Sequence, residues 1–377
     1  MNIILPFIES RVAIEDLKDI EDFDKIAVRL GLNGYAILNT KFSEKSKLKG
    51  KSKHSLEHIT RYEIVEESVE KVKKILPKVR HQYELISVKT TSAKVAQWIV
   101  KDNRVDILNV PLKSIKETIT HPLANVATEN ETFIEIDLSP IIFDQIKNKS
   151  IHLRQLNRML NILIGERTPF VLTCNVKTPY MFRGKRAIKS IAGIIGIPDS
   201  IFKENYEKFH ARIEMNQKKL SGKMKAPGIW IKKEDSKKKE KKVKESYDPD
   251  ILNVISKWKT DSLKNKQLER QRYFLFEILT EKDVKITEKV FLDQFWKSFT
   301  EFFGVINSSK SGVYVSKYDE VAKIGILRCS HKTIDHVRST LAFISKIENT
   351  KVLIHVLRVS GTMKNLLTIV KKKSGEK

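Results

Sequence analysis

The side chains with the clearest capacity for chemistry in this chain are basic, and they gather at a few places. Arg183, Lys185 and Arg186 stand directly before an apolar segment with helical spacing. Backbone N–H groups at the start of that helix would add to their positive charge, which favours a phosphate clamp. Arg154 and Arg158 are four residues apart, so both project from the side of a predicted helix opposite its leucines. That pair faces either solvent or a polyanion.

A further basic cluster belongs to the segment Lys351–Leu366 near the C-terminus. A strand rich in Val, Ile and Leu turns at Gly361, and Thr362 occupies the position of a helix N-cap. Arg358 and Lys364 flank this turn, which places two cations beside the backbone N–H groups of a helix start. Both a phosphate contact and an ordinary capped turn agree with the pattern.

Metal or acid–base chemistry has much weaker support. His54 and His58 could share one face of a helix, yet they fall in a lysine-rich loop with no constellation of carboxylates nearby. Glu135 and Asp137 are a weak pair on a predicted strand, and the role that we expect is an ion pair of a strand-end carboxylate with Arg183 or Arg186. We therefore predict neither a catalytic residue nor a metal site in the chain itself.

The composition of the chain points to a polyanionic partner. Its 377 residues, enough for two or three domains, carry a formal net charge of +25 and a pI near 9.7. Nucleic acid is the first candidate and an anionic membrane surface the second. No apolar run reaches the roughly 18 residues of a membrane-spanning helix, and the N-terminus lacks the features of a signal peptide. The separated Cys174 and Cys329 indicate reduced, buried thiols in a cytoplasmic protein.

The elements that must position these side chains differ between the two ends of the chain. Residues 1–222 have the pattern of strands alternating with helices, including a first strand at Ile3–Phe7, a helix at Val65–Leu76 and a strand at Phe133–Leu138. Most of these strands are apolar on both faces, which predicts a parallel sheet covered by helices. The number of units, without a Gly-rich turn after the first strand, favours a TIM-barrel-like (β/α) domain.

The rest of the chain divides into a linker and a second domain. Residues 223–265 contain the densely charged run Lys232–Lys244, which predicts a basic, flexible linker or an arm that touches the polyanion. Residues 266–377 have the order β-α-β-β-α-β, the split βαβ of a ferredoxin-like, RRM-like fold. Apolar residues alternate on both faces of its last strand. The second face therefore needs a cover, from the helix after Thr362 or from a partner subunit.

Aromatic residues of this second domain do not have the usual RRM pattern. The central strand Ala322–Cys329 lacks the aromatic side chains on which RRM domains stack bases. Tyr273, Phe274 and Phe276 lie on the first strand, but alternation puts at least two of them in the core. We therefore expect contact with nucleic acid through Lys and Arg rather than through base stacking.

The C-terminal segments resemble archaeal ribonuclease P protein component 2. The closing run Arg358–Lys364, R-V-S-G-T-M-K, is similar to that family's V-S-G-T-I-K. Arg272–Ile278 resembles its opening strand, and Gly325–Cys329 resembles its central strand. The three motifs occur in the family's order over the last third of the chain.

The N-terminal segments resemble archaeal ribonuclease P protein component 3, a TIM-barrel-like family. The similarity rests on Phe133–Pro140 (F-I-E-I-D-L-S-P), on Pro169–Thr173 and on Arg154, Arg158, Arg183 and Arg186. The chain departs from the family at Phe182–Arg186, where an L-R-S-P-like run is usual. It also has an inserted lysine-rich loop after its second predicted strand.

These resemblances imply a fused ribonuclease P subunit that binds and activates a catalytic RNA for Mg²⁺-dependent removal of the 5′ leader from precursor tRNA. They imply that Mg²⁺ acts through the RNA, that the protein binds no cofactor, and that other ribonuclease P proteins are partners, with a homodimer through the C-terminal domain as a further option. Two alternatives stay open: a metal-dependent barrel phosphoesterase with an RNA-binding domain, and a non-catalytic RNA-binding assembly protein. The residues that we expect to contact RNA are Arg154, Arg158, Arg183, Lys185, Arg186, Arg272, Arg328, Arg358 and Lys364.

Overall fold

The structure, a computed structural model, describes residues 7–45, 56–144, 146–222, 224–226, 229–230, 251, 254–255, 258 and 270–367. Within these ranges the chain forms two compact units. Residues 3–6 of the predicted first strand, His54 with most of the inserted lysine-rich loop, and the lysine-rich run Lys232–Lys244 lie outside them.

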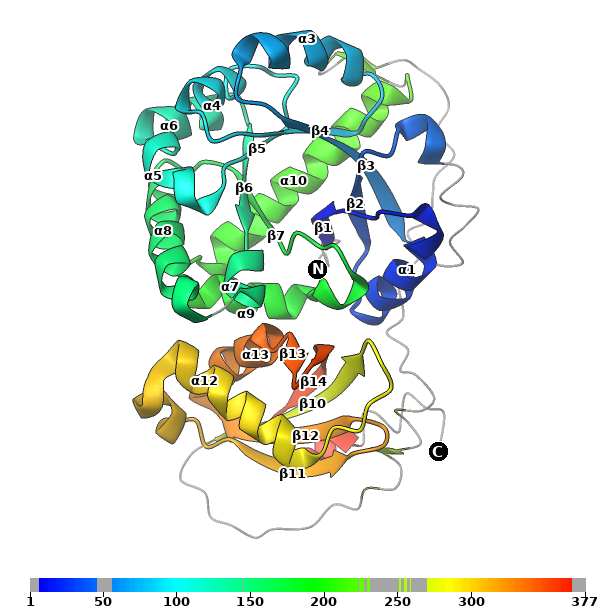
Figure 1. Cartoon of the computed structure of the whole chain (residues 1–377), viewed down its shortest axis with the longest axis vertical. Helices are drawn as coiled ribbons and strands as arrows, with labels where there is room; N and C mark the ends of the chain where they lie inside the picture. Colours follow the sequence, from blue (N-terminus) through cyan, green and yellow to red (C-terminus); the bar gives the residue numbers. More distant parts are fainter. Residues whose placement is uncertain are drawn as a thin grey trace. The chain divides into compact units, whose positions relative to one another are not determined.

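The N-terminal unit is a parallel sheet whose strands follow one another in sequence order. Its first and last strands also meet, through a parallel bridge between Val12 and Val176, so the sheet is nearly closed into a barrel. Figure 1 shows the helices around it, and the predicted TIM-barrel-like fold is confirmed. The strands are β1 (Ile8–Val12), β2 (Gly34–Leu38), β3 (Glu57–Val65), β4 (Leu85–Lys89), β5 (Ile107–Asn109), β6 (Phe133–Asp137) and β7 (Phe170–Thr173).

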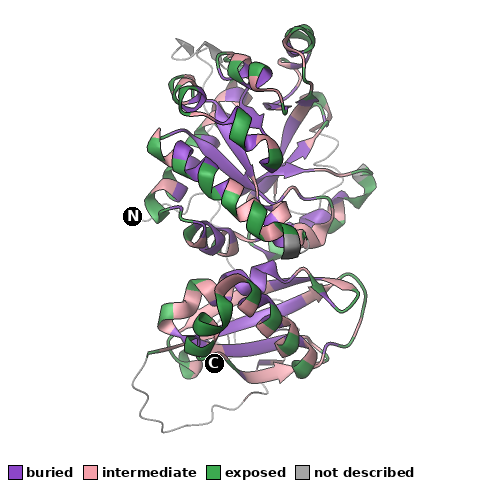
Figure 2. Cartoon of the chain, turned by 60° about the vertical axis from the view of Figure 1, so that its left-hand side comes forward, coloured by how far each residue is buried: buried purple, intermediate pink, exposed green. Residues whose placement is uncertain are grey.

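The helices of this unit turn apolar sides to the sheet and charged sides to solvent, which Figure 2 shows as purple and green faces. In α1, for example, Phe23 and Ala27 are buried while Lys25 and Arg29 are exposed. The α-helices of this unit are α1 (Ile20–Arg29), α3 (Val69–Val79), α4 (Ala93–Ile99), α5 (Ile115–Thr118), α6 (His121–Glu129), α7 (Ser139–Phe143), α8 (Ile146–Gly165) and α10 (Asp199–Leu220). Between α8 and α10 the chain also forms α9 (Lys185–Ile194).

The barrel interior begins with an apolar layer near the amino ends of the strands. Each strand contributes one buried residue, and α10 places Phe209 and Ile213 against them. The rings of Phe133 and Phe209 meet edge to face with centroids 5.3 Å apart. α10, which runs diagonally across the barrel in Figure 1, therefore closes this end. The strand residues of the apolar layer are Ile8, Ala36, Ile59, Leu85, Ile107, Phe133 and Val171.

Two strands of the barrel lie where the sequence predicted other structure. The first strand among the described residues is Ile8–Val12, which the sequence analysis did not predict, and Phe7 of the predicted Ile3–Phe7 precedes it outside any strand. β3 occupies Glu57–Val65, where we predicted loop and the start of a helix, and α3 begins only at Val69. Both strands carry Glu, Arg or His among apolar residues, a composition that in sequence is typical of a surface segment.

The C-terminal unit is an antiparallel sheet in the order β11-β12-β10-β14-β13. One long helix follows its first strand and a second follows β12, so the predicted ferredoxin-like fold is confirmed. The long helix is interrupted at Gly304, whose φ of 75° suits glycine. The elements are β10 (Gln271–Thr280), α12 (Glu288–Lys310), β11 (Tyr314–Asp319), β12 (Ile324–Ser330), α13 (Ile334–Phe343), β13 (Lys346–Ile347) and β14 (Thr350–Ser360). A separate short pair, β8 (Met224–Ala226) and β9 (Ile229–Trp230), precedes them.

Each face of this antiparallel sheet has its own apolar cover. Phe274, Phe276 and Leu327 project from the face that packs against α12 and α13. Leu275 and Ile326 project from the other face, where the chain on both sides of the domain covers them. The predicted cover by the helix after Thr362 is therefore confirmed, with residues of the predicted linker sharing the role. The face for which a partner subunit was the other expected cover is covered by the chain's own Ile251, Val254, Ile255, Trp258, Met363, Leu366 and Leu367.

Two observations concern membrane-spanning helices and the cysteines. Within the described residues, none of the helices has the length and apolar character needed to cross a membrane. Cys174 and Cys329 are both buried and free of disulfides, which agrees with the expected reduced thiols.

Candidate nucleic-acid interface

A polar layer lies two residues further along the barrel strands than the apolar layer. Because alternate strand residues project to the same side, it also points into the barrel. Arg61 and Glu135 form a doubly hydrogen-bonded ion pair in it, with N···O distances of 2.6 and 2.8 Å and both side chains fully buried. The Arg61 Nε donates to Ser87 Oγ, while Ser10 and Asn109 donate to Glu135. Burial alone would raise the pKa of Glu135, but Arg61 outweighs it and holds this pKa at about 2.

A second ion pair joins β1 to β3 nearer the carboxyl ends of the strands. Arg11 donates to both oxygens of Glu63, with N···O distances of 2.9 and 2.6 Å. It also donates to the Asn175 side-chain oxygen, and the Asn175 amide donates to Asp137 at 3.1 Å. Burial raises the pKa of Asp137. These contacts tie the first strand to the last and help to hold the barrel closed.

The carboxyl ends of TIM-barrel strands are where such folds place catalytic groups. In this barrel the two arginines at that end, Arg11 and Arg61, are paired with Glu63 and Glu135. Within the described ranges, no three His, Cys, Asp or Glu side chains gather as a metal-binding group. The expected pairing of Glu135 with Arg183 or Arg186 is wrong, because its partner is Arg61. This end of the barrel therefore has the chemistry of a structural ion-pair layer.

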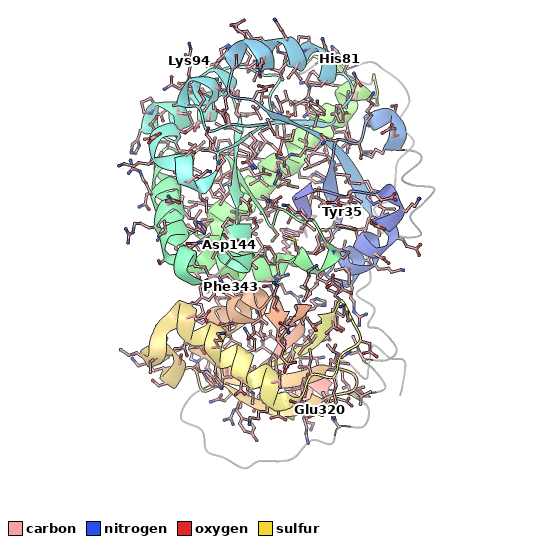
Figure 3. The ribbon with its side chains drawn as sticks, viewed as in Figure 1. Tyr35, His81, Lys94, Asp144, Glu320 and Phe343 are labelled. Atoms are coloured by element: carbon pink, nitrogen blue, oxygen red, sulfur yellow. The ribbon has the colours of Figure 1, made fainter. Side chains whose placement is uncertain are left out.

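His58 belongs to a strand and not to a loop. β3 places it in the core, 3% exposed, where its Nε2 lies 2.9 Å from Asp24 Oδ1. Tyr35 of β2, labelled in Figure 3, donates its hydroxyl to the same oxygen at 2.6 Å. Burial raises the pKa of Tyr35 far above its usual range. This buried group connects α1 with β2 and β3.

Glu9 of β1 is a buried carboxyl without a cationic hydrogen-bonding partner among the described side chains. It is 1% exposed and accepts hydrogen bonds from the Thr173 hydroxyl and the Cys174 N–H. Burial raises its pKa from 4.5 to about 7, against these hydrogen bonds, which lower it. A pKa that is raised in the folded state means that this group's contribution to stability is full below about pH 4.5 and is lost as the pH rises through about 7.

We expect Glu9→Gln to remove that pH dependence. The free energy of unfolding of both proteins can be measured with urea at pH 5 and pH 8. Between these two pH values the variant should gain stability relative to the wild type by on the order of 3 kcal/mol. Gln is neutral at both, whereas Glu9 must be ionised inside the barrel at pH 8. A difference between the two proteins that stays constant with pH would contradict the burial argument.

The predicted cluster at residues 183–186 is divided by burial. Arg183 is 1% exposed, and its guanidinium donates to the carbonyl oxygens of Tyr180 and Phe182. Burial lowers its pKa to about 10. Contrary to our expectation, this side chain presents no charge at the surface. Lys185 is half-buried and Arg186 is exposed at the start of α9.

α8 carries the other two predicted arginines of the barrel on an exposed face. Arg154 and Arg158 are exposed, while Leu156 and Leu160 on the opposite side are buried. This helix, IKNKSIHLRQLNRMLNILIG, contains no Asp or Glu over its 20 residues. Neither arginine therefore has a carboxylate available on its own helix.

α10 shows the more ordinary arrangement of surface charge. Lys203 lies 3.7 Å from Glu207, and Lys208 lies 2.8 Å from Glu204, both at a spacing of four residues. Such pairs are typical of a helix face that meets only water. The contrast indicates that the cations of α8 suit an external anion.

The turn after β14 has the capped geometry that the sequence predicted. The Thr362 Oγ1 accepts a hydrogen bond from the Asn365 N–H at 3.1 Å, and Lys364 is exposed beside it. The Arg272 guanidinium lies next to Gly361, since a Cβ placed there would be 3.7 Å from its Nη1. The structure thus brings a predicted cation of β10 to the predicted turn.

Arg328 and Arg358 are half-buried residues of the same sheet. β12 places Arg328 opposite Tyr314 on one side and Tyr273 on the other. β14 places Arg358 opposite Leu275. Tyr314 belongs to none of the motifs singled out in the sequence. Tyr273 was noted there, and the alternation of β10 separates it from the core residues Phe274 and Phe276.

Comparison with known proteins identifies both units. A family model for RNase P subunit p30 matches residues 6–220, more than half of the chain. The chain belongs to the RNase P subunit p30 family. Over this region it is 26% identical to ribonuclease P protein component 3 of Methanosarcina mazei, across 183 residues that make up 48% of this chain and 76% of the relative.

The C-terminal unit belongs to a second family. A model for the Rpp14/Pop5 family matches residues 272–370. Ribonuclease P protein component 2 of Pyrococcus horikoshii is 31% identical over 98 residues, which cover 26% of this chain and 80% of the relative. The corresponding protein of Methanocaldococcus jannaschii is 34% identical over 96 residues, 26% of this chain and 69% of the relative. One polypeptide thus joins two families of ribonuclease P protein subunits.

A solved structure supports the fold. A chain in a cryo-EM structure of archaeal ribonuclease P with mature tRNA matches with a TM-score of 0.51 and 18% identity, covering 60% of this chain and 100% of that chain. Both family resemblances inferred from motifs, and the fold classes that they implied, are therefore confirmed.

Proposed function

We propose that this protein is a ribonuclease P subunit that binds and activates the catalytic RNA for Mg²⁺-dependent removal of the 5′ leader from precursor tRNA. The observation that carries the proposal is the union, in one chain, of the two families of ribonuclease P protein subunits. Its partners are then ribonuclease P RNA, precursor tRNA and the other protein subunits. The chemistry and its Mg²⁺ belong to the RNA, and the protein itself binds no cofactor.

The polar interior of the barrel supports this division of labour. Arg61 and Arg11 each hold a carboxylate through two hydrogen bonds. A general acid or base needs a pKa near the working pH and access to substrate, and Glu135, with a pKa of about 2 and no exposure, has neither. Glu9 has a pKa of about 7, but it is 1% exposed and so lacks access to substrate. The part of the protein is then to neutralise phosphates and to hold the RNA in its active shape.

The surface charge supports the same role. The net charge of +25 favours association with RNA. On the barrel, the acid-free helix α8 presents Arg154 and Arg158. Arginine and asparagine side chains on such a face donate hydrogen bonds to phosphate and to 2′-hydroxyl oxygens. Lys185, Arg186, Arg272, Arg328, Arg358 and Lys364 are the further contacts that we propose, and Arg183 is withdrawn because it is buried.

The test is a cleavage assay with the full-length protein, the cognate ribonuclease P RNA and a 5′-labelled precursor tRNA. We expect no cleavage by the protein alone, cleavage by the RNA at high Mg²⁺, and cleavage at markedly lower Mg²⁺ when both are present. The physical reason is that arginine and lysine replace part of the Mg²⁺ that otherwise screens the RNA phosphates.

Two outcomes would contradict this proposal. Cleavage by the RNA-free protein would favour the barrel phosphoesterase. An Mg²⁺ requirement that the protein leaves unchanged would favour an assembly protein without a role in the reaction.

A further inference from the structure

A row of side chains crosses four strands on one face of the C-terminal sheet. Strand pairing places Tyr314, Arg328, Tyr273 and Ser360 side by side across β11, β12, β10 and β14. Directly paired residues project to the same face. That face is the one opposite α12 and α13, because Tyr273 packs at the border of the cluster that covers it.

The row remains accessible although the middle of that face is covered. Its neighbours Leu275 and Ile326, two residues along their strands, are buried under the chain's own cover. Tyr314, by contrast, is 60% exposed, which is unusual for a tyrosine ring on a strand. The cover thus stops short of the row.

Arg328 lies between the two rings with part of its hydrogen-bonding capacity unused. Its guanidinium carbon is 5.5 Å from the Tyr314 ring centroid, a cation–π arrangement. Its Nε is buried and has no hydrogen-bond acceptor. The side-chain oxygen of Gln271, two residues before Tyr273 on the same face, is likewise buried without a donor. It costs free energy to leave a buried donor and a buried acceptor without hydrogen bonds, which points to a ligand that supplies a partner for each.

The charge around the row selects the ligand. The next row on the same face pairs Leu275 with Arg358 and with Ile326, and Ile326 with Lys317. Among the described residues neither row contains a carboxylate, and Glu277, further along, is bonded to His355 at 3.0 Å. Two aromatic rings with a guanidinium between them offer planar surfaces on which the bases of single-stranded RNA can stack. The surrounding cations suit its phosphates.

We propose that Tyr314, Arg328 and Tyr273 form a stacking platform for unpaired nucleotides of the RNA. This inference rests on the proposed function and adds to it a mode of recognition. The expectation that base stacking is absent followed from a central strand without aromatics. Here the rings come from the strands on either side, and the central strand supplies a planar guanidinium instead.

The experiment compares two probes on the full-length chain: a short oligouridine carrying one 2-aminopurine, and a fully paired RNA hairpin. Tyr314→Leu should weaken binding of the single strand by about tenfold or more, the effect of one lost stacking contact, and should abolish quenching of the 2-aminopurine. Binding of the hairpin should change less than about twofold, because paired bases cannot stack on the row. Tyr314→Phe should keep wild-type behaviour, and Arg328→Lys, which retains charge but not planarity, should resemble Tyr314→Leu.

The matched control is Arg154→Gln/Arg158→Gln, which should weaken the binding of both probes and leave the quenching of the bound 2-aminopurine intact. Equal losses on both probes for Tyr314→Leu, or no loss on either, would overturn the platform. The platform would also be overturned if Tyr314→Leu changed only the self-association of the chain, because the row would then be a protein–protein contact. If the wild-type protein activates the RNA and Tyr314→Leu binds oligouridine as tightly as the wild type, the platform is overturned and the proposed function stands. If the wild-type protein fails to activate the RNA, that result counts against the proposed function alone.

Discussion

Replacing Arg61 with Met is expected to destabilise the barrel by about 3–5 kcal/mol, because it leaves the buried Glu135 carboxylate without its counter-ion. Arg61 is fully buried and donates to Glu135, to Ser87 Oγ and to the Ser10 carbonyl oxygen. Methionine fills much of the same volume, so the loss reports on charge more than on packing. Native-state hydrogen exchange of peptides from β3 and β6 in the full-length chain would measure it.

The pH dependence of this loss tests its cause. Arg61 holds the pKa of Glu135 at about 2, so the stability that the pair contributes is present above the ordinary carboxyl pKa and is lost as the pH falls through about 2. In Arg61→Met the pKa of Glu135 should rise, and the deficit should shrink as the pH is lowered to about 4. Arg61→Met/Glu135→Gln should recover part of the loss at neutral pH, since no charge is then buried.

Lys203→Met on α10 is the matched control, because it breaks an exposed ion pair instead of a buried one. Exposed pairs contribute about 0–1 kcal/mol, and the Lys203 and Glu207 side chains are 66% and 47% exposed. A loss for Arg61→Met no larger than that of the control would show that the ion pair is not what holds the layer together.

Removing the two exposed arginines of α8 is expected to make RNA binding less dependent on salt. Each phosphate contact releases counter-ions, so Arg154→Gln/Arg158→Gln should lower the slope of log affinity against log salt by about one per lost contact, or about two in all. At low salt the same change should weaken binding of ribonuclease P RNA by at least about tenfold. Filter binding or fluorescence titration over a salt series would measure both quantities.

The control for α8 removes the same amount of charge from the exposed face of another helix, α10. Lys203→Gln/Lys208→Gln on α10 deletes two cations that already have carboxylate partners on their own helix. It should change the salt slope by much less, because these cations are not available to phosphates. Equal slopes for the two variants would show that net charge alone governs binding and that α8 has no special place in the interface.

The sequence by itself determined most of the architecture. Apolar strands at regular intervals specify a parallel sheet, since strands that are buried on both faces must be apolar on both faces. The C-terminal order β-α-β-β-α-β and the cap at Thr362 follow from local periodicity and from the preference of a threonine for a helix start. The exposed positions of Arg154 and Arg158 follow from helical spacing in the same way.

Tertiary structure alone decided where buried charge lies. β1 and β3 were missed because Glu9, Arg11, Arg61 and Glu63 have the composition of a surface segment. Their partners are far along the chain, as Glu135 is from Arg61, and a single sequence gives no sign of which opposite charges will meet inside a closed barrel. Arg183 was misplaced for the same reason: local charge suggested a surface clamp, whereas the fold buries its guanidinium against backbone carbonyls. An arginine on an amphipathic helix shows its exposure through periodicity, but an arginine in a loop or a barrel strand shows it only once the strands have closed around it.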